Sequence, residues 1–337
     1  MLSAFITGLA GLDLTAREAA VLRQARPAGV ILFARNVADP DQVRRLTRDA
    51  RAAIGADDIL VLIDQEGGRV RRLRPPHWRE LPAAAAYGAI YAHDRERALR
   101  AARLVARLTA ADLRGVGINT DCTPVLDLPV AGSHEVIGDR AYGHDPAQVI
   151  ALGRAVAEGL MAGGVLPVIK HVPGHGRATV DSHEHLPVVD ASREELEGTD
   201  FAPFRALGDL PAAMTAHVVF TAIDAGAAAS VSRRVTGEVI RGAIGFDGLL
   251  MSDDLGMQAL SGTIAERAAA VIAAGSDLAS LCSGNLSETE AVAGAVPKLD
   301  GAALARYRRA CAVFGQQQAF DVGEAQACLA EVLRAVA

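Results

Sequence analysis

The chain has 337 residues, half of them hydrophobic, which is enough to bury a large core. Lys and Arg number 34 against 40 Asp and Glu, and the formal net charge of −6 predicts neither a nucleic-acid nor a membrane partner. The four cysteines are widely spaced without a CxxC pair, which argues against a disulfide framework or a zinc ribbon. The first residues carry no basic segment before an apolar run, so we expect a cytoplasmic protein, and a monomer.

Short apolar runs alternate with longer segments rich in Ala, Leu and Arg. The apolar runs predict eight strands, at Ala4–Leu9, Gly29–Ala34, Ile59–Asp64, Val116–Asp121, Pro167–His171, Ala212–His217, Gly248–Ser252 and Asp277–Leu281. The longer segments predict amphipathic helices, among them Pro40–Ile54, Arg95–Arg114, Pro146–Ala162, Arg233–Ile244 and Ile264–Ala274. Eight alternating units predict an α/β fold, a single-domain (β/α)8 TIM barrel over residues 1–337, and a doubly wound open sheet is the alternative.

No Gly/Ser-rich linker divides the chain. Residues 301–337 are predicted to form C-terminal helices packed outside the barrel. Two connections are unusually long, His77–His93 and Val172–Pro211, and long loops within a compact domain are more often functional than accidental.

Polar residues gather at the carboxyl ends of the predicted strands. They are Asp64, Asp121, Lys170, His171, His217 and Asp253. In a barrel these ends converge on the face that holds active sites, and in an open sheet they face the ligand as well. The sequence therefore predicts a site at this edge in either fold.

The segment KHVPGHG at Lys170–Gly176, followed by DSH at Asp181–His183, predicts a loop that leaves a strand. If Asp181–His183 is extended, the carboxylate and the imidazole point the same way, and the Asp raises the pKa of the His. Such a His can donate a proton near neutral pH. A zinc site is the alternative, with donors His171, His175, His183, His185 and Asp181. The HExxH pattern is missing and glycines separate the donors, so we expect no metal.

Two further motifs end strands. In Ser252-Asp253-Asp254-Leu255 one acid can face the barrel mouth, where it can attack an anomeric carbon, while the other caps a helix or bonds backbone amides. The spacing does not decide which acid does which. In Asp64–Val70, DQEGGRV, Asp64 can accept hydrogen bonds from sugar hydroxyls. Arg72, Arg140 and Lys170 bring positive charge, and Arg140 suits ligand binding and structural pairing equally.

Together, KHVPGHG, DSH, SDDL, DQEGGRV and IGDR resemble the β-N-acetylhexosaminidases of glycoside hydrolase family 3, especially bacterial members of cell-wall recycling. The resemblance runs from about Ile31–Asn36 to beyond Ser252–Met257. It implies a retaining hydrolysis with Asp253 as nucleophile and His183 as acid/base, assisted by Asp181. It also implies that N-acetylglucosamine is bound, without a metal or cofactor, by Asp64, Arg72, Arg140, Lys170 and His171. The implied substrate is N-acetylglucosaminyl-1,6-anhydro-N-acetylmuramic acid, with or without its peptide.

The chain departs from that pattern in places. The similar enzymes often carry an acidic residue where this chain has Arg177, Ser where it has Ala141, and Phe where it has Val172. Three other functions remain open from the residues: a β-N-acetylglucosaminide phosphorylase, a metal-dependent barrel hydrolase and a non-catalytic sugar-binding barrel.

Overall fold

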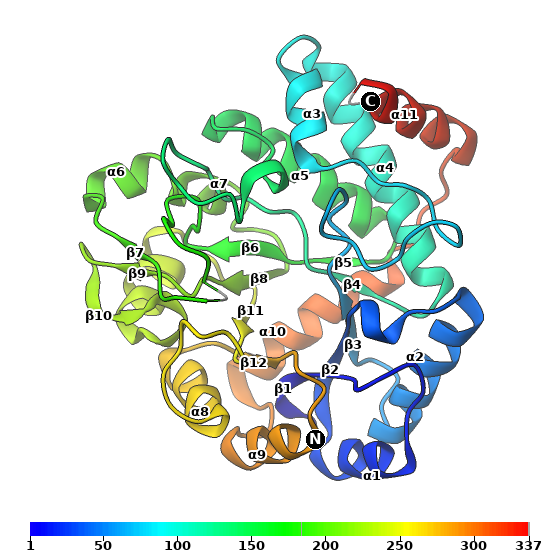
Figure 1. Ribbon diagram of the computed structural model, residues 1–337, viewed down its shortest axis with the longest axis vertical. Coiled ribbons are helices and arrows are strands. Elements are labelled where there is room, and N and C mark those ends of the chain that lie inside the picture. Colours follow the sequence, from blue (N-terminus) through cyan, green and yellow to red (C-terminus); the bar gives the residue numbers. More distant parts are fainter. Residues whose placement is uncertain (183, 336–337) are drawn as a thin grey trace.

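The computed structural model describes residues 1–182 and 184–335. Among these, nine strand segments form one parallel sheet that curves into a barrel (Figure 1). In pairing order they are β5 (Leu166–Pro167), β4 (Thr120–Asp121), β3 (Leu60–Ile63), β2 (Pro27–Leu32), β1 (Ser3–Gly8), β12 (Leu278–Leu281), β11 (Leu249–Asp254), β8 (Ala212–Thr215) and β6 (Ile169–Val172). Each of the eight predicted runs overlaps at least one of these segments, and Pro167–His171 overlaps both β5 and β6.

The barrel closes because β5 and β6 are two parts of one extended segment. Only Val168 separates β5 from β6, the two ends of the pairing order. The amide of Val168 donates to Asp121 O at 3.0 Å, and the amide of Leu126 donates to Lys170 O at 2.7 Å. The segment that contains β4 therefore pairs along the whole of β5 and β6, and the predicted α/β barrel is confirmed.

Alternate strand residues face opposite sides of the barrel wall. In β3, Leu60 and Leu62 pack with side chains of the barrel interior, whereas Val61 and Ile63 pack against the helices outside. All four are fully buried. A strand buried on both faces reads as a continuous apolar run, which is why these strands stand out in the sequence.

Helices cover the outside of the barrel (Figure 1). They are α1 (Ala16–Ala25), α2 (Pro40–Ile54), α3 (Ala84–Tyr91), α4 (Arg95–Gly115), α5 (Pro146–Ala162), α6 (Arg193–Gly198), α7 (Phe201–Ala206), α8 (Ile264–Ala274), α9 (Leu286–Ala295), α10 (Gly301–Cys311) and α11 (Val322–Ala335). Local signals fix several starts: Thr15 and Thr263 each form a capping box with the Glu three residues later, at α1 and α8. Within the described ranges no helix has the length and apolar character to cross a bilayer.

The C-terminal helices lie in different places. Helix α10 covers the amino end of the barrel, where Tyr307 and Ala310 pack with interior residues of the strands. The Tyr307 hydroxyl donates to Ala28 O at 2.8 Å and to Asp58 O at 2.9 Å, next to β2 and β3. Helix α11 packs against α4 and α3.

The long connections contain more structure than the sequence patterns indicate. The segment His77–His93 includes α3, and the segment Val172–Pro211 includes β7 (Val188–Val189), α6 and α7. Strand β7 joins β9 (Val219–Phe220) and β10 (Asp224–Ala228) in a small second sheet. The predicted helix at Arg233–Ile244 is a π-helix, η4 (Val235–Ala243), and it contains two glycines, which are poor α-helix formers.

Candidate active site

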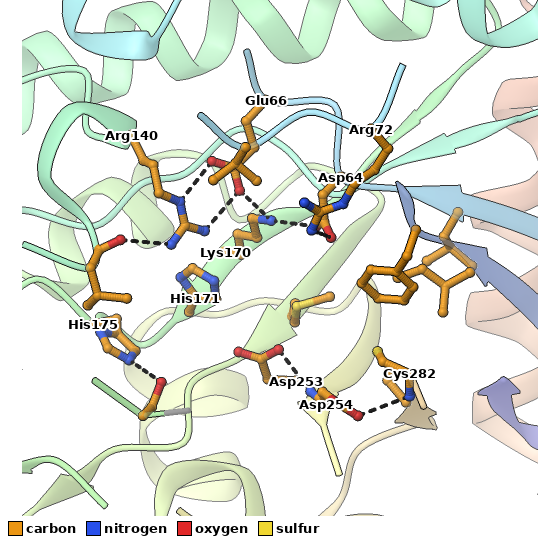
Figure 2. A pocket seen from close by; sticks show the side chains of 18 of the residues that line it. Asp64, Glu66, Arg72, Arg140, Lys170, His171, His175, Asp253, Asp254 and Cys282 are labelled. Carbon is orange, nitrogen blue, oxygen red and sulfur yellow. Dashed lines mark hydrogen bonds and ion pairs between the residues drawn. The ribbon is translucent and has the colours of Figure 1, made fainter. Parts of the chain in front are cut away.

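A pocket of about 480 Å³ opens at the carboxyl ends of the barrel strands (Figure 2). Asp64 follows β3, Lys170 and His171 lie in β6, and Asp253 lies in β11. All four line the pocket, and so do Arg72, Arg140 and Asp181. The structure thus brings together, from five separate segments, all the predicted site residues that it describes. His183 lies outside the described residues.

Lys170 is the centre of a buried cluster of charges. Its Nζ atom lies 2.9 Å from Asp64 Oδ1 and 2.7 Å from Glu66 Oε1, and its side chain is 3% exposed. Burial alone lowers the pKa of Lys170, but the two carboxylates outweigh burial and raise it. Burial likewise opposes ionisation of Asp64 and Glu66, yet Lys170 and the arginines lower the pKa of both carboxyls. All three groups are therefore charged at neutral pH.

Two arginines complete this cluster. Arg72 donates from Nη2 to Asp64 Oδ2 at 2.9 Å. Arg140, at the end of η2 (Gly138–Arg140), binds Glu66 through Nε and Nη2 with two hydrogen bonds of 2.9 Å. Such bidentate pairs fix both position and orientation. The structure shows the structural pairing of Arg140, which is ion-paired with Glu66, and places Arg140 in the lining of the pocket.

His171 is held by a buried carboxylate. Its Nδ1 atom lies 2.6 Å from Asp127 Oδ2, and Asp127 Oδ1 accepts the backbone amide of His175 at 2.7 Å. Burial opposes ionisation of Asp127, but His171 outweighs it and lowers the pKa of this carboxyl. The pairing of Leu126 with Lys170 places Asp127 beside His171, so the second half of the β4 segment supplies this partner. The ring nitrogen Nδ1 is thereby committed to Asp127, which orients the ring of His171.

The two acids of β11 have different surroundings. Asp254 Oδ1 accepts the amides of Gly256 and Cys282, both at 3.0 Å, and burial raises the pKa of Asp254. Burial opposes ionisation of Asp253 too, but His171 and His217 outweigh it and lower the pKa of Asp253. Asp253 is therefore an ionised carboxylate facing the pocket, whereas Asp254 secures the strand end.

His217 is hydrogen-bonded to the end of this strand. Its Nε2 atom is 3.0 Å from Asp254 O, and its Nδ1 atom is 2.6 Å from Ser230 Oγ. The ring is fully buried, and burial lowers its pKa. His217 thus fixes the backbone directly after Asp254, the second acid of β11.

The sequence patterns missed several residues of the site. Glu66 lies in a recognised motif and His217 ends a predicted strand, but no role was assigned to them, and His175 was considered only as a donor of the alternative zinc site. Asp127 was missed altogether, although it follows the apolar run Val125-Leu126 just as the other strand-end acids follow theirs. Within residues 1–182 and 184–335, no group of three or more His, Cys, Asp or Glu is placed to hold a metal ion.

The arrangement suits a polyhydroxylated ligand. One side of the pocket offers charged donors and acceptors for hydroxyl groups, in Asp64, Arg72 and Lys170. The opposite side offers an ionised carboxylate, Asp253, with Asp181 on the loop nearby. A ligand held by the first side therefore faces Asp253 across the pocket (Figure 2).

Comparison with known proteins finds enzymes that act on sugars. The family model described as glycosyl hydrolase family 3 N terminal domain matches residues 6–309. The beta-hexosaminidase of Alkalilimnicola ehrlichii is 42% identical over 286 residues, which are 84% of this chain and 81% of the relative. The beta-hexosaminidase of Bordetella avium is 41% identical over 278 residues, 81% of this chain and 79% of that protein. The crystal structure of NagZ from Neisseria gonorrhoeae in complex with N-trifluoroacetyl-D-glucosamine has a TM-score of 0.88 at 33% identity and covers 98% of both chains.

Proposed function

Because this chain belongs to glycosyl hydrolase family 3 and to its β-N-acetylhexosaminidases, we propose that it removes non-reducing terminal N-acetylglucosamine with retention of configuration. The proposed substrate is N-acetylglucosaminyl-1,6-anhydro-N-acetylmuramic acid, with or without its peptide. Both acids line the pocket and accept backbone amides, so the observation that carries the mechanism is the direction of their pKa shifts: the pKa of Asp253 is lowered beside His171, whereas the pKa of Asp254, which accepts two amides, is raised by burial.

The sugar is held by charged side chains on the side of the pocket opposite Asp253. Asp64, Lys170 and Arg72 exchange hydrogen bonds with its hydroxyls, and His171 contacts it from β6. These groups are already fixed by one another, so little conformational entropy is lost when the sugar binds. The NagZ structure that holds N-trifluoroacetyl-D-glucosamine supports a pocket for an N-acylated glucosamine.

In the first step Asp253 attacks the anomeric carbon while protonated His183 donates its proton to the glycosidic oxygen. The carbon–oxygen bond to the leaving sugar breaks, and a glycosyl ester forms on Asp253. In the second step neutral His183 takes a proton from water, whose oxygen attacks the same carbon and frees Asp253. Asp181, two residues before His183, stabilises the imidazolium.

The lining of the pocket supports an anionic leaving group. Arg35 lines the pocket and donates to the backbone carbonyls of Leu9 and Cys282, whereas Arg69 is ion-paired with Asp139. N-acetylmuramic acid carries a lactyl carboxylate, or a peptide that ends in one, and the cation of Arg35 attracts such a group. We also propose that the protein acts in the cytoplasm, which its four free cysteines support.

The test compares the two acids of β11. Asp253→Asn is expected to lower kcat on an aryl β-N-acetylglucosaminide by at least about a thousandfold, because the covalent nucleophile is lost. Asp254→Asn is the matched control and should retain more activity. Mass spectrometry of wild type quenched during turnover should find the sugar on the peptide that contains Asp253. A larger loss in Asp254→Asn, or a better rate on the aryl β-glucoside, would overturn the assignment.

The same assay in phosphate buffer separates hydrolysis from phosphorolysis. We expect free N-acetylglucosamine as the product. N-acetylglucosamine 1-phosphate would show instead that phosphate, not water, resolves the glycosyl-enzyme.

A further inference from the structure

The loop between β6 and β7 has two unlike halves. Its base, residues 173–178, is buried apart from half-buried Arg177. Its tip, residues 179–186, is exposed or half-buried where it is described, with the exception of Ser182, which is 2% exposed. The tip carries Asp181 and the position of His183, so whatever places the tip also places the proposed proton donor.

Several contacts fix the base to the barrel. A Cβ atom on Gly176 would lie 2.0 Å from Leu128 O, so this backbone packs directly on the β4 segment. The amide of His134 donates to Ala178 O at 2.7 Å. Arg177 donates from Nε to Asp200 Oδ2 at 2.7 Å, and the side chain of Asp200 is 2% exposed. The base is therefore a rigid platform.

Ser182 connects the tip to this platform. Its Oγ atom lies 2.9 Å from His175 Nε2, and both residues are buried. Burying a hydroxyl costs free energy unless it is hydrogen-bonded. In the position that the tip adopts, the hydrogen bond to His175 offsets the cost of burying the Ser182 hydroxyl.

His175 is itself tied to the sugar-binding side of the pocket. Its backbone amide donates to Asp127, which also holds His171, and the rings of His171 and His175 lie 5.6 Å apart (Figure 2). Burial, together with the neighbouring His171, lowers the pKa of His175 to about 4. His175 is therefore uncharged at neutral pH and does not serve as a second proton donor.

We propose that the hydrogen bond between Ser182 and His175 is a latch that seats the loop tip over Asp253. Ser182 and His175 are thus positioning residues that act through the tip, and this inference rests on the proposed role of His183 as acid/base. The latch aligns proton donation with the sugar held by His171, because Asp127 bonds both histidine segments.

The test exploits the leaving group. A 2,4-dinitrophenolate leaves without proton assistance, whereas a 4-methoxyphenolate needs it. Ser182→Ala removes one oxygen atom, and we expect it to lower kcat/KM at least about tenfold on 4-methoxyphenyl β-N-acetylglucosaminide. On the 2,4-dinitrophenyl substrate the loss should be below about threefold, because kcat/KM reports formation of the glycosyl-enzyme. Thr179→Ala, an exposed hydroxyl of the same tip, is the matched control and should change neither value.

A double-mutant cycle tests whether the two residues act through one bond. If they do, Ser182→Ala combined with His175→Ala should be no worse than His175→Ala alone. Equal losses on both substrates in Ser182→Ala, or additive losses in the double variant, would overturn the latch. Two further variants distinguish a failure of the latch from a failure of the proposed function. If the proposed function holds, His183→Ala should lower kcat/KM on the 4-methoxyphenyl substrate selectively, and Asp253→Asn should lower kcat/KM on both substrates.

Discussion

Asp121 is a buried carboxyl group behind the charge cluster of the pocket. Its Oδ1 atom accepts the amide of Gln65 at 2.9 Å, whereas its Oδ2 atom has no hydrogen-bond partner among the described residues. Burial raises the pKa of Asp121 to about 8. The folded protein therefore holds a proton that the unfolded chain releases above about pH 4. Stability attributable to this group falls as pH rises from about 4 to about 8.

Asp121→Asn removes this penalty and keeps an acceptor for Gln65. We expect the free energy of unfolding of the variant, relative to that of wild type, to increase as pH rises, by about 1–3 kcal/mol at pH 8. Urea denaturation at pH 5 and pH 8 measures this difference. A variant that is equally destabilised at both pH values would show that Asp121 is ionised and paired in the folded protein.

Lys170 is the opposite case, a buried charge that two acids share. In Lys170→Met, Asp64 keeps only Arg72 and Glu66 keeps only Arg140, and the cation between the two buried acids is lost, so we expect a loss of about 3–5 kcal/mol in unfolding free energy at pH 7. The lowered pKa values of both acids mean that wild-type stability from this cluster is present above about pH 4 and is lost on further acidification. Lys298→Met, at the exposed second lysine of the chain, is the control and should cost less than about 1 kcal/mol in the same denaturation experiment.

Strand-end residues were predictable because apolar runs show where a strand stops. Asp64, Lys170 and Asp253 each stand at such a stop, and the barrel brings these stops together. Glu66 was not assigned a role because its position depends on how the loop after β3 folds back, whereas Asp127 follows an apolar run as the other strand-end acids do and was overlooked. Spacing alone could not separate Asp253 from Asp254, since the difference lies in their surroundings: Asp254 accepts the amides of Gly256 and Cys282, whereas Asp253 lies beside His171.

The base of the loop between β6 and β7 depends on close packing at Gly176. Gly176→Ala would bring a Cβ atom within 2.0 Å of Leu128 O, so the base must move. We expect kcat/KM on a 4-methoxyphenyl substrate to fall at least about tenfold, because a displaced base misplaces the tip. Gly294→Ala, in α9 with open space around it, is the control and should leave kcat/KM unchanged while the melting temperature stays equal or rises. Equal activity of the two variants would show that the base tolerates movement.

Elements with strong local signals were predicted, and those held by distant contacts were not. Helices α2 and α5 each begin with an Asp cap and Pro, and both match their predicted bounds. The small sheet of β7, β9 and β10 has strands of two to five residues that pair only because the barrel brings them together. No periodicity in such short segments distinguishes them from loop.

Helix α10 covers the amino end of the barrel, opposite the pocket. Tyr307→Phe removes the donor to Ala28 O and Asp58 O, so we expect about 1–3 kcal/mol lower unfolding free energy. The values of kcat and KM should not change at 25 °C, because the hydroxyl lies at the far end of the barrel. Tyr91→Phe, at a half-buried ring, should be nearly neutral. A drop in kcat for Tyr307→Phe in fully folded protein would contradict this separation.

The sealed barrel has a kinetic consequence. The interior below the pocket is filled by side chains such as Leu62 and Met251, and α10 covers the far end, so among the described residues the pocket is closed at its base. In the proposed mechanism, a hexosamine seated at Asp64 and Asp253 therefore lies beneath the rest of its substrate. The departing saccharide must exit before water can enter, and the hexosamine is released last. Free N-acetylglucosamine should therefore inhibit competitively, whereas the first-released fragment should inhibit by reacting backward with the glycosyl-enzyme.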